Sequence, residues 1–346
     1  MTRQPLVACT AYKGATLAFA LLALLVLFAL SLAGGATRVS VADILSALAG
    51  PLAGVMGLEP ASSPVEWIVR DLRLPRALLA TMVGAGLAVV GVLLQTATRN
   101  DLADPFLFGL SSGAAAGAVA VITVTGDALG VWTLPLAAFA GGVVSALAVL
   151  LLARRAQGEG PERMVLAGLA ISFIFSALTH VLVFAGDQRA AHSVLFWSLG
   201  GLGLARWDNV ALALAGLAML AALVVRKRHA LDALLAGDDT AHSLGVNAER
   251  LRSQVFVVSA LATACFVALT GVIGFVGLMV PHVARSFGGV LHGRVLPAAA
   301  ALGAALLLGS DLVARTLLAP QELPVGIVTA SVGACFVIAM LLRRHP

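Results

Sequence analysis

One short stretch of this sequence has an unusually high density of charged residues. The segment LLAGDDTAHSLGVNAERLR, residues 234–252, holds five charged side chains in a chain that is only 11% charged. Two further groups stand out: Arg73 and Arg76 in RLPR, and Asp311 and Arg315, which their spacing places on one helix face. Arginines and carboxylates in such patterns form ion pairs, either within the chain or with another protein. These groups are therefore candidate contact sites.

Catalytic and metal-binding signatures are missing from the sequence. It contains no G-x-x-x-x-G-K-[ST] phosphate loop, no H-E-x-x-H and no G-x-S-x-G. His180 and His282 each stand without neighbouring histidine, cysteine or carboxylate ligands, so packing or capping explains them better than metal binding. The cysteines number three and two lie in apolar runs, which argues against a disulfide framework. We expect a chain that is not an enzyme and binds no metal or cofactor of its own.

The composition places these candidate sites in a membrane protein. Hydrophobic residues make up 60% of the 346 residues, and charged residues fall far below the roughly 25% of soluble domains. Most uncharged runs approach the roughly 20 residues that cross about 30 Å of hydrocarbon as a helix. The runs hold too few alternating polar residues for barrel strands, so helices must satisfy the backbone in lipid. The expected fold class is therefore an all-α, polytopic membrane protein.

The uncharged runs predict ten transmembrane helices in a single domain, residues 1–346. The first run has an apolar core from Leu17 to Leu32, which is longer than that of a signal peptide, so we interpret it as a retained helix. The run 253–284 is too long for one helix, and its glycines and Pro281 indicate two spans joined by a tight turn. The expected spans are residues 17–34, 74–97, 105–124, 131–153, 163–185, 207–226, 253–271, 275–291, 295–317 and 324–342.

Lysine and arginine are distributed unevenly between the two sides that ten spans define. Fifteen of the 22 basic residues fall on the side of the termini. The positive-inside rule makes that side cytoplasmic, so both termini and residues 234–252 are expected in the cytoplasm. This asymmetry accounts for the net charge of +5 without a nucleic-acid partner. On the outer side, residues 186–207 are expected to form a short helix at the membrane interface, anchored by Trp197 and Trp207.

Five segments, in chain order, resemble the FecCD-type permeases, the transmembrane subunits of ABC importers that carry iron–siderophore chelates, haem or cobalamin into bacteria. The resemblance implies ten helices per subunit, a homodimer in the cell inner membrane, two cytoplasmic ATPase subunits that hold ATP and magnesium, and a periplasmic or surface substrate-binding protein. The segments are RLPRALLATMVGAGLAVVGVLLQTATRNDLADPFLFGLSSGA (73–114), LFWSLGGL (195–202), LGVN (244–247), GVIGFVGLMVPHVAR (271–285) and ELPVGIVTASVGACFVI (322–338).

By this resemblance, residues 231–249 form a pair of short cytoplasmic helices that seat in a groove of the ATPase. The glycines at 237 and 245 can break and turn the chain, the leucines can give a helix an apolar face, and the paired aspartates favour a helix N-terminus. The alternative is a solvated loop, which has little use for a leucine-rich turn between glycines. The residues expected to couple to the ATPase are Leu234, Leu235, Gly237, Asp238, Ala241, Leu244, Gly245, Val246 and Asn247.

The resemblance also assigns an outer docking site and a passage. Arg73, Arg76 and Arg315 match arginines that grip acidic residues on the binding protein, although an ion pair with Asp311 is an alternative for Arg315. Spans five, eight and ten would line a wide passage that offers no tight site, so affinity would reside in the binding protein. The small polar residues that could face this passage, unless they bond to their own helices, are Ser172, Ser176, Thr179, Thr329 and Ser331.

The expected mechanism is alternating access driven by ATP on the partner subunit, with the cytoplasmic helices passing the movement to the spans. The expected cargo is an iron chelate, either a ferric siderophore or haem, with cobalamin as the alternative, because nothing in the apparent lining selects among them. A secondary transporter or a channel is the alternative of another class. Ion coupling calls for ionisable groups near mid-bilayer, and the centres of these spans are almost empty of charge.

Overall fold

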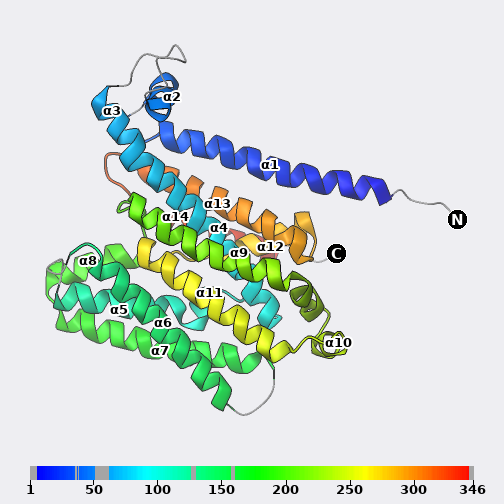
Figure 1. The fold of residues 1–346 in the computed structure, drawn as a ribbon. Coiled ribbons are helices and arrows are strands. Elements are labelled where there is room, and N and C mark those ends of the chain that lie inside the picture. The colour runs from blue at the N-terminus through cyan, green and yellow to red at the C-terminus, as the bar shows by residue number, and fades with distance from the viewer. Residues whose placement is uncertain are drawn as a thin grey trace.

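The computed structural model describes residues 6–35, 37, 39–50, 62–125, 130–156 and 160–342. Every regular element in these ranges is a helix, which agrees with the expected all-α fold (Figure 1). The elements are α1 (Leu6–Ala33), α2 (Val41–Ala49), α3 (Ser63–Trp67), the π-helix η2 (Ile68–Arg73), α4 (Leu74–Thr98), the 3-10 helix η3 (Pro105–Phe108), α5 (Leu110–Val124), α6 (Thr133–Arg155), α7 (Glu162–Ala185), α8 (Gln188–Ser198), α9 (Trp207–Leu235), α10 (Asp238–Ser243), α11 (Ala248–Thr270), α12 (Val276–Gly288), α13 (His292–Thr316) and α14 (Val325–Leu342).

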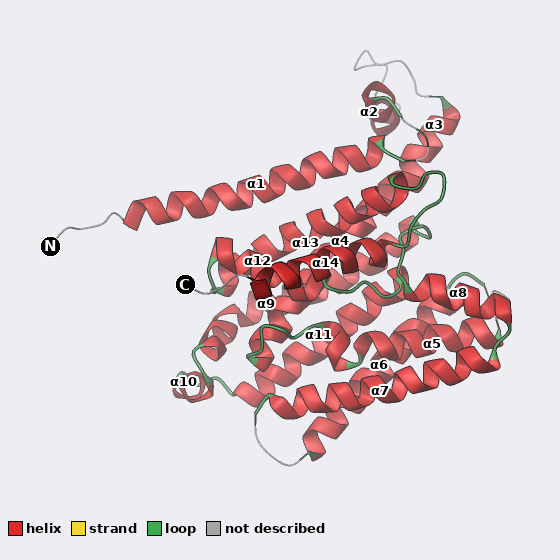
Figure 2. Cartoon of the chain, turned by 180° about the vertical axis from the view of Figure 1, so that it is seen from behind, coloured by secondary structure: helices red, strands yellow, loops and turns green. Residues whose placement is uncertain are grey.

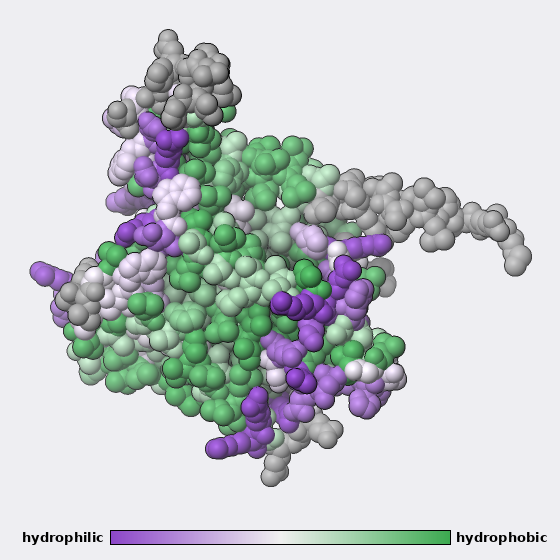
Figure 3. All heavy atoms as spheres, viewed as in Figure 1, coloured by the Kyte–Doolittle hydropathy of each residue, from purple (hydrophilic) through white to green (hydrophobic). Residues whose placement is uncertain are grey.

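Helices of membrane-spanning length dominate the described part of the chain. Seven are long and apolar enough to cross a membrane: α4 with the residues before it, α6, α7, α9, α11, α13 and α14. Ala18–Ala33 of α1 and the helix α5 are apolar but shorter. Each of the ten expected spans coincides with a helix, but α12 has only 13 residues, so the count of ten stays a prediction. Figure 3 shows the broad hydrophobic surface of these helices between two hydrophilic margins.

Helix α4 lies at the centre of the fold. In its most apolar window 83% of the residues are buried, against 17% in α7 and in α14. Glycines let the neighbouring helices approach closely, since a Cβ at Gly84 would collide with Gly303 of α13 and one at Gly91 with Gly277 of α12. Polar side chains at the two ends of α4 can therefore reach helices that are distant in sequence.

The long helices run between two ends of the molecule. Figures 1 and 2 show the start of α1, the end of α14 and the short helix α10 at one end, which we call the inner end. Helices α2, α3 and α8 lie at the opposite, outer end. The short helix expected within residues 186–207 is α8, whose N-terminus is capped because Asp187 accepts a hydrogen bond from the N–H of Ala190 at 2.7 Å.

The connection between α11 and α12 differs from the expected tight turn. Gly271 packs against the carbonyl of Trp197 at the end of α8, whereas Gly277 packs against Gly91 in the inner half of α4. Five non-helical residues therefore run inward before α12 begins, and Phe275 adopts a left-handed conformation at that point, with φ +66°. Helix α12, about 20 Å long at 1.5 Å per residue, covers only the inner part of this crossing.

Helix α9 extends into the segment expected to hold two short helices. Its 29 residues measure about 43 Å, which is longer than the roughly 30 Å of hydrocarbon. The chain then breaks at Gly237 and forms a single short helix, α10. The first of the two expected helices is thus the last turn of α9, because Leu231 and Leu234 continue its fully buried face.

Candidate functional site

The segment that follows α9 is a short helix held between two glycine turns. Gly237, with φ +106°, precedes α10, and Gly245, with φ +77°, follows it; glycine adopts such left-handed conformations without strain. The N–H groups of Gly245 and Val246 bond to carbonyls in the last turn of α10 and so close its C-terminus. Asn247 then caps α11 by accepting a hydrogen bond from the N–H of Arg250 at 2.8 Å. We call residues 237–247 the inner tip.

The inner tip is anchored on one side and exposed on the other. Ala241 and the preceding Leu234 are fully buried. Leu244 is 66% exposed and Leu235 is 36% exposed. A Cβ at Gly245 would meet nothing within 4 Å, so the space beside this exposed leucine is open. The predicted coupling residues thus divide into an internal anchor and a surface that has the apolar character of a protein contact.

Arg252 joins the inner tip to the end of α4. Its buried side chain donates from Nε to the carbonyl of Ala97 at 2.8 Å and from its two terminal nitrogens to Asp238 at 3.0 and 2.6 Å. A nitrogen of Arg99 lies 3.7 Å from the same carboxylate. The hydrogen bond from Arg252 is the main cause that lowers the pKa of Asp238, so this carboxylate is charged at neutral pH. One guanidinium therefore bridges α10 and α4.

Further polar contacts gather at the same end of α4. Gln95 accepts a hydrogen bond from Arg285 of α12 at 2.7 Å. The hydroxyl of Thr96 lies 2.9 Å from Nε2 of His292 in α13, and Nδ1 of His292 lies 2.7 Å from Asp232 of α9. Three consecutive positions of α4 thus bond to α11, α12 and α13, and His292 extends the network to Asp232 of α9. We call the set the inner cluster: Gln95, Thr96, Asp232, Asp238, Arg252, Arg285 and His292.

Sequence reasoning missed most of the inner cluster. Arg252 and Arg285 counted there only as positive charge on the cytoplasmic side, and Gln95, Thr96 and His292 received no role. The available signal was the polar run from Gln95 to Arg99, which ends an otherwise uncharged span. Polar side chains that end a buried helix need partners, because an unpaired buried group costs free energy.

A buried carboxylate lies just beyond this end of α4. Asp104 precedes η3 and accepts a hydrogen bond from the N–H of Phe106 at 2.9 Å. Burial raises the pKa of Asp104 to about 6, and the hydrogen bond from Phe106 opposes that effect only in part. Its Oδ2 faces the first turn of α12, because a Cβ at Gly277 would lie 3.2 Å away. The inner end therefore contains a carboxyl group that titrates in mild acid.

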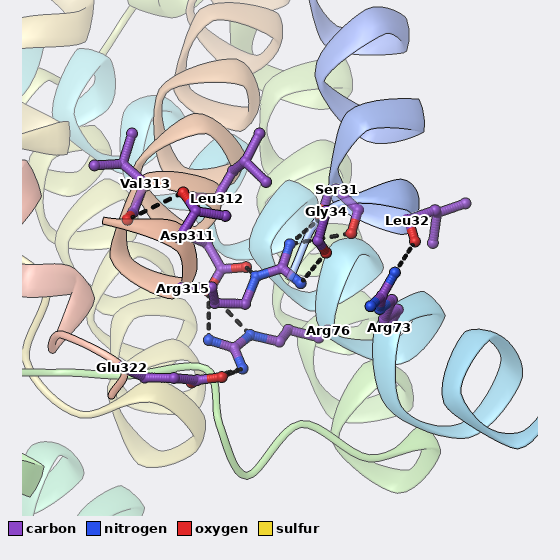
Figure 4. Close-up of polar contacts among 11 residues, drawn as sticks. Ser31, Leu32, Gly34, Arg73, Arg76, Asp311, Leu312, Val313, Arg315 and Glu322 are labelled. Atoms are coloured by element: carbon purple, nitrogen blue, oxygen red, sulfur yellow. Dashed lines mark hydrogen bonds and ion pairs between the residues drawn. The ribbon is translucent and has the colours of Figure 1, made fainter. Parts of the chain in front are cut away.

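The charged residues at the outer end of α4 pair within the chain (Figure 4). Arg76 lies 2.9 Å from Asp311 and 2.9 Å from Glu322. Nε of Arg315 lies 3.1 Å from Oδ2 of Asp311, which is fully buried, and Arg315 also donates to the hydroxyl of Ser31 on α1 at 2.9 Å. The ion pair that the sequence left open as an alternative for Arg315 is thus present. We call the set the outer cluster: Arg73, Arg76, Asp311, Arg315 and Glu322.

Arg73 completes the outer cluster from the junction of η2 and α4. Its buried guanidinium donates to the carbonyls of Leu32 and Ala33 at 2.6 and 3.0 Å and also to that of Thr37, and so satisfies groups left free where α1 ends. Of the three arginines expected to dock a binding protein, two are therefore buried and bonded internally. Arg76 is the one that pairs with an exposed side chain, the carboxylate of Glu322.

The small polar residues expected along a passage mostly bond to their own helices. Ser172, Thr179 and Ser331 each donate to the carbonyl four residues earlier at 2.8 Å. Thr329 is buried and donates to the carbonyl three residues earlier at 3.2 Å, and Ser176 is half-buried. Ser331 on α14 remains exposed and is the best placed of the five to meet a passage outside this subunit.

Together these sites are suited to protein contacts and to the transmission of movement. In the described residues no group of three or more histidine, cysteine, aspartate or glutamate side chains is placed to hold a metal ion. A polar cavity of about 480 Å³ opens beside the inner tip, and its wall includes Arg154, Arg163 and Glu249. An exposed leucine next to a polar cavity offers a partner protein both apolar and charged contacts.

A family, two relatives and one solved structure resemble this chain. Residues 23–343 match the FecCD transport family. The chain is 38% identical over 278 residues to the hemin transport system permease protein HmuU of Yersinia pestis, which covers 80% of this chain and 83% of that protein. It is 39% identical over 278 residues to the cobalamin import system permease protein BtuC of Halobacterium salinarum, with coverage of 80% and 74%. The fold matches that of a metal-chelate-type ABC transporter in an inward-facing conformation, with a TM-score of 0.81, 29% identity and coverage of 95% and 99%.

Proposed function

The chain belongs to the FecCD transport family, and from that premise we propose that it is the membrane-spanning permease subunit of a binding-protein-dependent ABC importer in the cell inner membrane. We expect two separate cytoplasmic subunits to hold ATP and magnesium; residues 1–346 contain no phosphate-binding loop of their own. In this assignment the inner end, where α1 begins, α14 ends and the inner tip lies, faces the cytoplasm. The excess of lysine and arginine on that side supports this orientation.

The proposal rests on the exposed apolar surface of the inner tip. Leu244 is 66% exposed although it lies beyond the apolar helices, and open space surrounds the adjacent Gly245. A solvated loop would have no reason to present a leucine at a rigid, doubly capped turn. We propose that the ATPase covers this surface and that Leu234 and Ala241 anchor the tip from within the permease.

The inner cluster can transmit a movement of the inner tip to the membrane-spanning helices. When the ATPase subunits close on ATP, they displace α10, and the Asp238–Arg252 pair passes the displacement to the carbonyl of Ala97. Because α4 packs against α12 and α13 through glycines, a shift of α4 changes the packing of both. Alternating access then follows from the rearrangement of two discrete helix packings.

The outer end would receive the substrate-binding protein, and two copies of the permease would enclose the passage. Helices α7 and α14 are the least buried of the seven long apolar helices, which supports their exposure to a second subunit or to the passage. For docking, we propose that Arg76 exchanges its pair with Glu322 for a carboxylate of the binding protein. Arg73 and Arg315 would help to position Arg76 indirectly, since both hold the end of α1 in place beside it.

The proposed cargo is an iron chelate, either haem or a ferric siderophore, and cobalamin is the second candidate. The relative from Yersinia pestis is a hemin permease and the relative from Halobacterium salinarum is a cobalamin permease, at nearly equal identity. The cargo is best identified by the partner binding protein, because that protein carries the affinity. Binding of haem, a ferric siderophore and cobalamin to it should be compared by tryptophan fluorescence.

The test of the importer function is uptake into vesicles that contain the permease together with its ATPase subunits and loaded binding protein. Uptake should require ATP and the binding protein, and it should persist when ionophores abolish all ion gradients. Uptake that follows an ion gradient without ATP would identify a secondary transporter. Passive flux without either would identify a channel.

A further inference from the structure

A second cavity is mostly apolar, and His292 is the one member of the two clusters in its lining. It has a volume of about 470 Å³ and opens between α9 and α13, with Val89 of α4 at its floor. Its walls come from leucine, valine and alanine side chains such as Leu217, Ala221, Leu296 and Ala300. Nothing in the candidate coupling, docking or passage sites uses these residues. An apolar groove of this size between two membrane-spanning helices is suited to a hydrocarbon chain.

The inner mouth of this groove is strongly basic. Arg228 forms part of its wall; Arg226 and Lys227 directly precede Arg228 in sequence, and Arg294 directly follows the lining residue Gly293. None of these four cations forms an ion pair with a carboxylate in the described residues; Arg228 contacts only the ring of His229, at 3.3 Å. Unpaired cations above an apolar groove are complementary to a molecule with an anionic head and a hydrocarbon tail.

The one nearby carboxylate is already bonded. Asp232, one turn beyond Arg228 on α9, accepts from the backbone N–H of His292 at 2.8 Å and lies 2.7 Å from its Nδ1. It therefore holds α9 to α13 and leaves the arginines available. At the same mouth a Cβ at Gly293 would meet nothing within 4 Å, and Pro297 cannot donate to the Gly293 carbonyl, so there is both space and free polar backbone for a headgroup.

We propose that this groove binds one anionic phospholipid from the leaflet on the inner side, with its phosphate against Arg228 and Arg294 and an acyl chain between α9 and α13. A second copy of the permease is a poor occupant, because two copies joined here would bring their unpaired cations together. A free phosphate ion is a poor occupant as well, because most of the cavity is hydrocarbon. The proposal goes beyond the importer function and does not depend on it.

Lipid photo-crosslinking tests the charge preference. The intact chain is reconstituted in phosphatidylcholine discs that contain a trace of phosphatidylglycerol with a photoreactive acyl chain, and labelled peptides are mapped by mass spectrometry. We expect labels within 217–228 and 293–300, and less label from a phosphatidylcholine probe. Arg228→Gln and Arg294→Gln should each lower phosphatidylglycerol labelling about fivefold, as expected when one cation near a lipid surface is lost. Arg155→Gln, an exposed arginine at the inner end of α6, should leave labelling unchanged.

A second variant tests the groove without changing its charge. Ala221→Phe fills the cavity and should abolish labelling by both probes, whereas Ala215→Phe, exposed on the same helix outside the cavity, should not. Equal labelling by the two lipids, or labelling that survives Ala221→Phe, would overturn the proposal. Displacement of the probe by inorganic phosphate would instead indicate a free-anion site. A disulfide between two copies carrying Ala221→Cys would show that a second permease covers the groove, and would overturn the proposal too.

Discussion

The two ends of α4 use the same kinds of side chain in opposite ways. At the outer end, Arg76 and Arg315 flank Asp311, whose side chain is fully buried among long helices. At the inner end, Arg252 is equally buried, but the carboxylate of Asp238 is 36% exposed and belongs to a six-residue helix. The outer cluster therefore holds α1, α4 and α13 together, whereas the inner cluster connects α4 to a small exposed unit.

This difference in burial separates stability from transmission. A buried pair that loses one partner leaves an uncompensated charge, so the outer cluster should respond to mutation through folding. A pair that is partly in water contributes little to stability, so the inner cluster should respond through coupling to the ATPase. Variants at the two ends that affect stability and ATPase coupling alike would contradict this distinction.

The largest effect is expected from Asp311→Ala at the outer end. The change leaves the buried guanidinium of Arg315, and that of Arg76, which is 12% exposed, without their shared partner, which costs about 3–5 kcal/mol. We expect a sharp fall in the apparent melting temperature and in the yield of folded permease in detergent. Glu322→Ala is the control, because its side chain is 49% exposed and an exposed pair contributes about 0–1 kcal/mol. Similar losses in both variants would mean that burial does not set the strength of this cluster.

A pH-dependent effect is expected from Asp104→Asn beside the inner end. The folded-state pKa of Asp104, about 6, lies above the ordinary carboxyl value of 3.8. Protonation of Asp104 therefore stabilises the folded protein by about 3 kcal/mol below about pH 4. This stabilisation is lost as the pH rises through about 6. Asparagine stays neutral, so the variant should be the more stable protein at about pH 7.5 and lose that advantage near pH 4.

Thermal unfolding of wild type and Asp104→Asn, compared across this pH range, measures the effect. An advantage of the variant that does not change with pH would show that the carboxyl group is not titrating in the folded protein. Asp101→Asn provides the control, because the Asp101 side chain is 76% exposed and pairs only with Arg285 in the described residues.

A smaller effect on stability but a clear effect on coupling is expected from Arg252→Ala. The variant loses its pair with Asp238, whose carboxylate is 36% exposed and can be hydrated, so the loss of stability should be well below that of Asp311→Ala. ATPase activity stimulated by the loaded binding protein should fall about tenfold or more, while the permease still inserts. Arg250→Ala, two residues away and exposed, should retain stimulation. Unchanged stimulation in Arg252→Ala would show that movement reaches α4 by another route.

The smallest effect is expected from Glu322→Gln, which tests docking at Arg76. If Arg76 exchanges partners with the binding protein, removal of the Glu322 charge should strengthen docking by up to about fivefold at low salt, and less at physiological salt. Surface plasmon resonance with the permease in discs measures the affinity at both salt concentrations. Docking that is unaffected at either concentration would mean that the outer cluster is internal only.

The sequence was informative where composition and spacing decide the structure. Uncharged runs indicate helices because lipid leaves the backbone no other partner, and glycines at 237 and 245 predict the breaks on either side of α10. The burial of Arg73 could not be foreseen, since the carbonyls it bonds belong to the end of α1 and to Thr37 just after it, 36 to 41 positions earlier. For the same reason the link from Arg252 to Ala97, 155 positions away, required the packing of α4 against α11.

Two closely matched glycines can test whether the inner tip seats in an ATPase. Gly245 and Gly289 both have φ +77°, and a Cβ at either meets nothing within 4 Å. Aspartate therefore introduces the same charge at each position, on a side chain that projects into open space from a residue with positive φ. Only at Gly245 would the carboxylate be buried by a partner, at a cost of several kcal/mol.

The measurement is recovery of the ATPase on affinity-purified permease carrying Gly245→Asp or Gly289→Asp. We predict that Gly245→Asp weakens the complex about a hundredfold, which corresponds to a loss of about 3 kcal/mol, while Gly289→Asp retains its partner. Full recovery with Gly245→Asp, or equal loss in both variants, would contradict the assignment of the inner tip as the coupling surface.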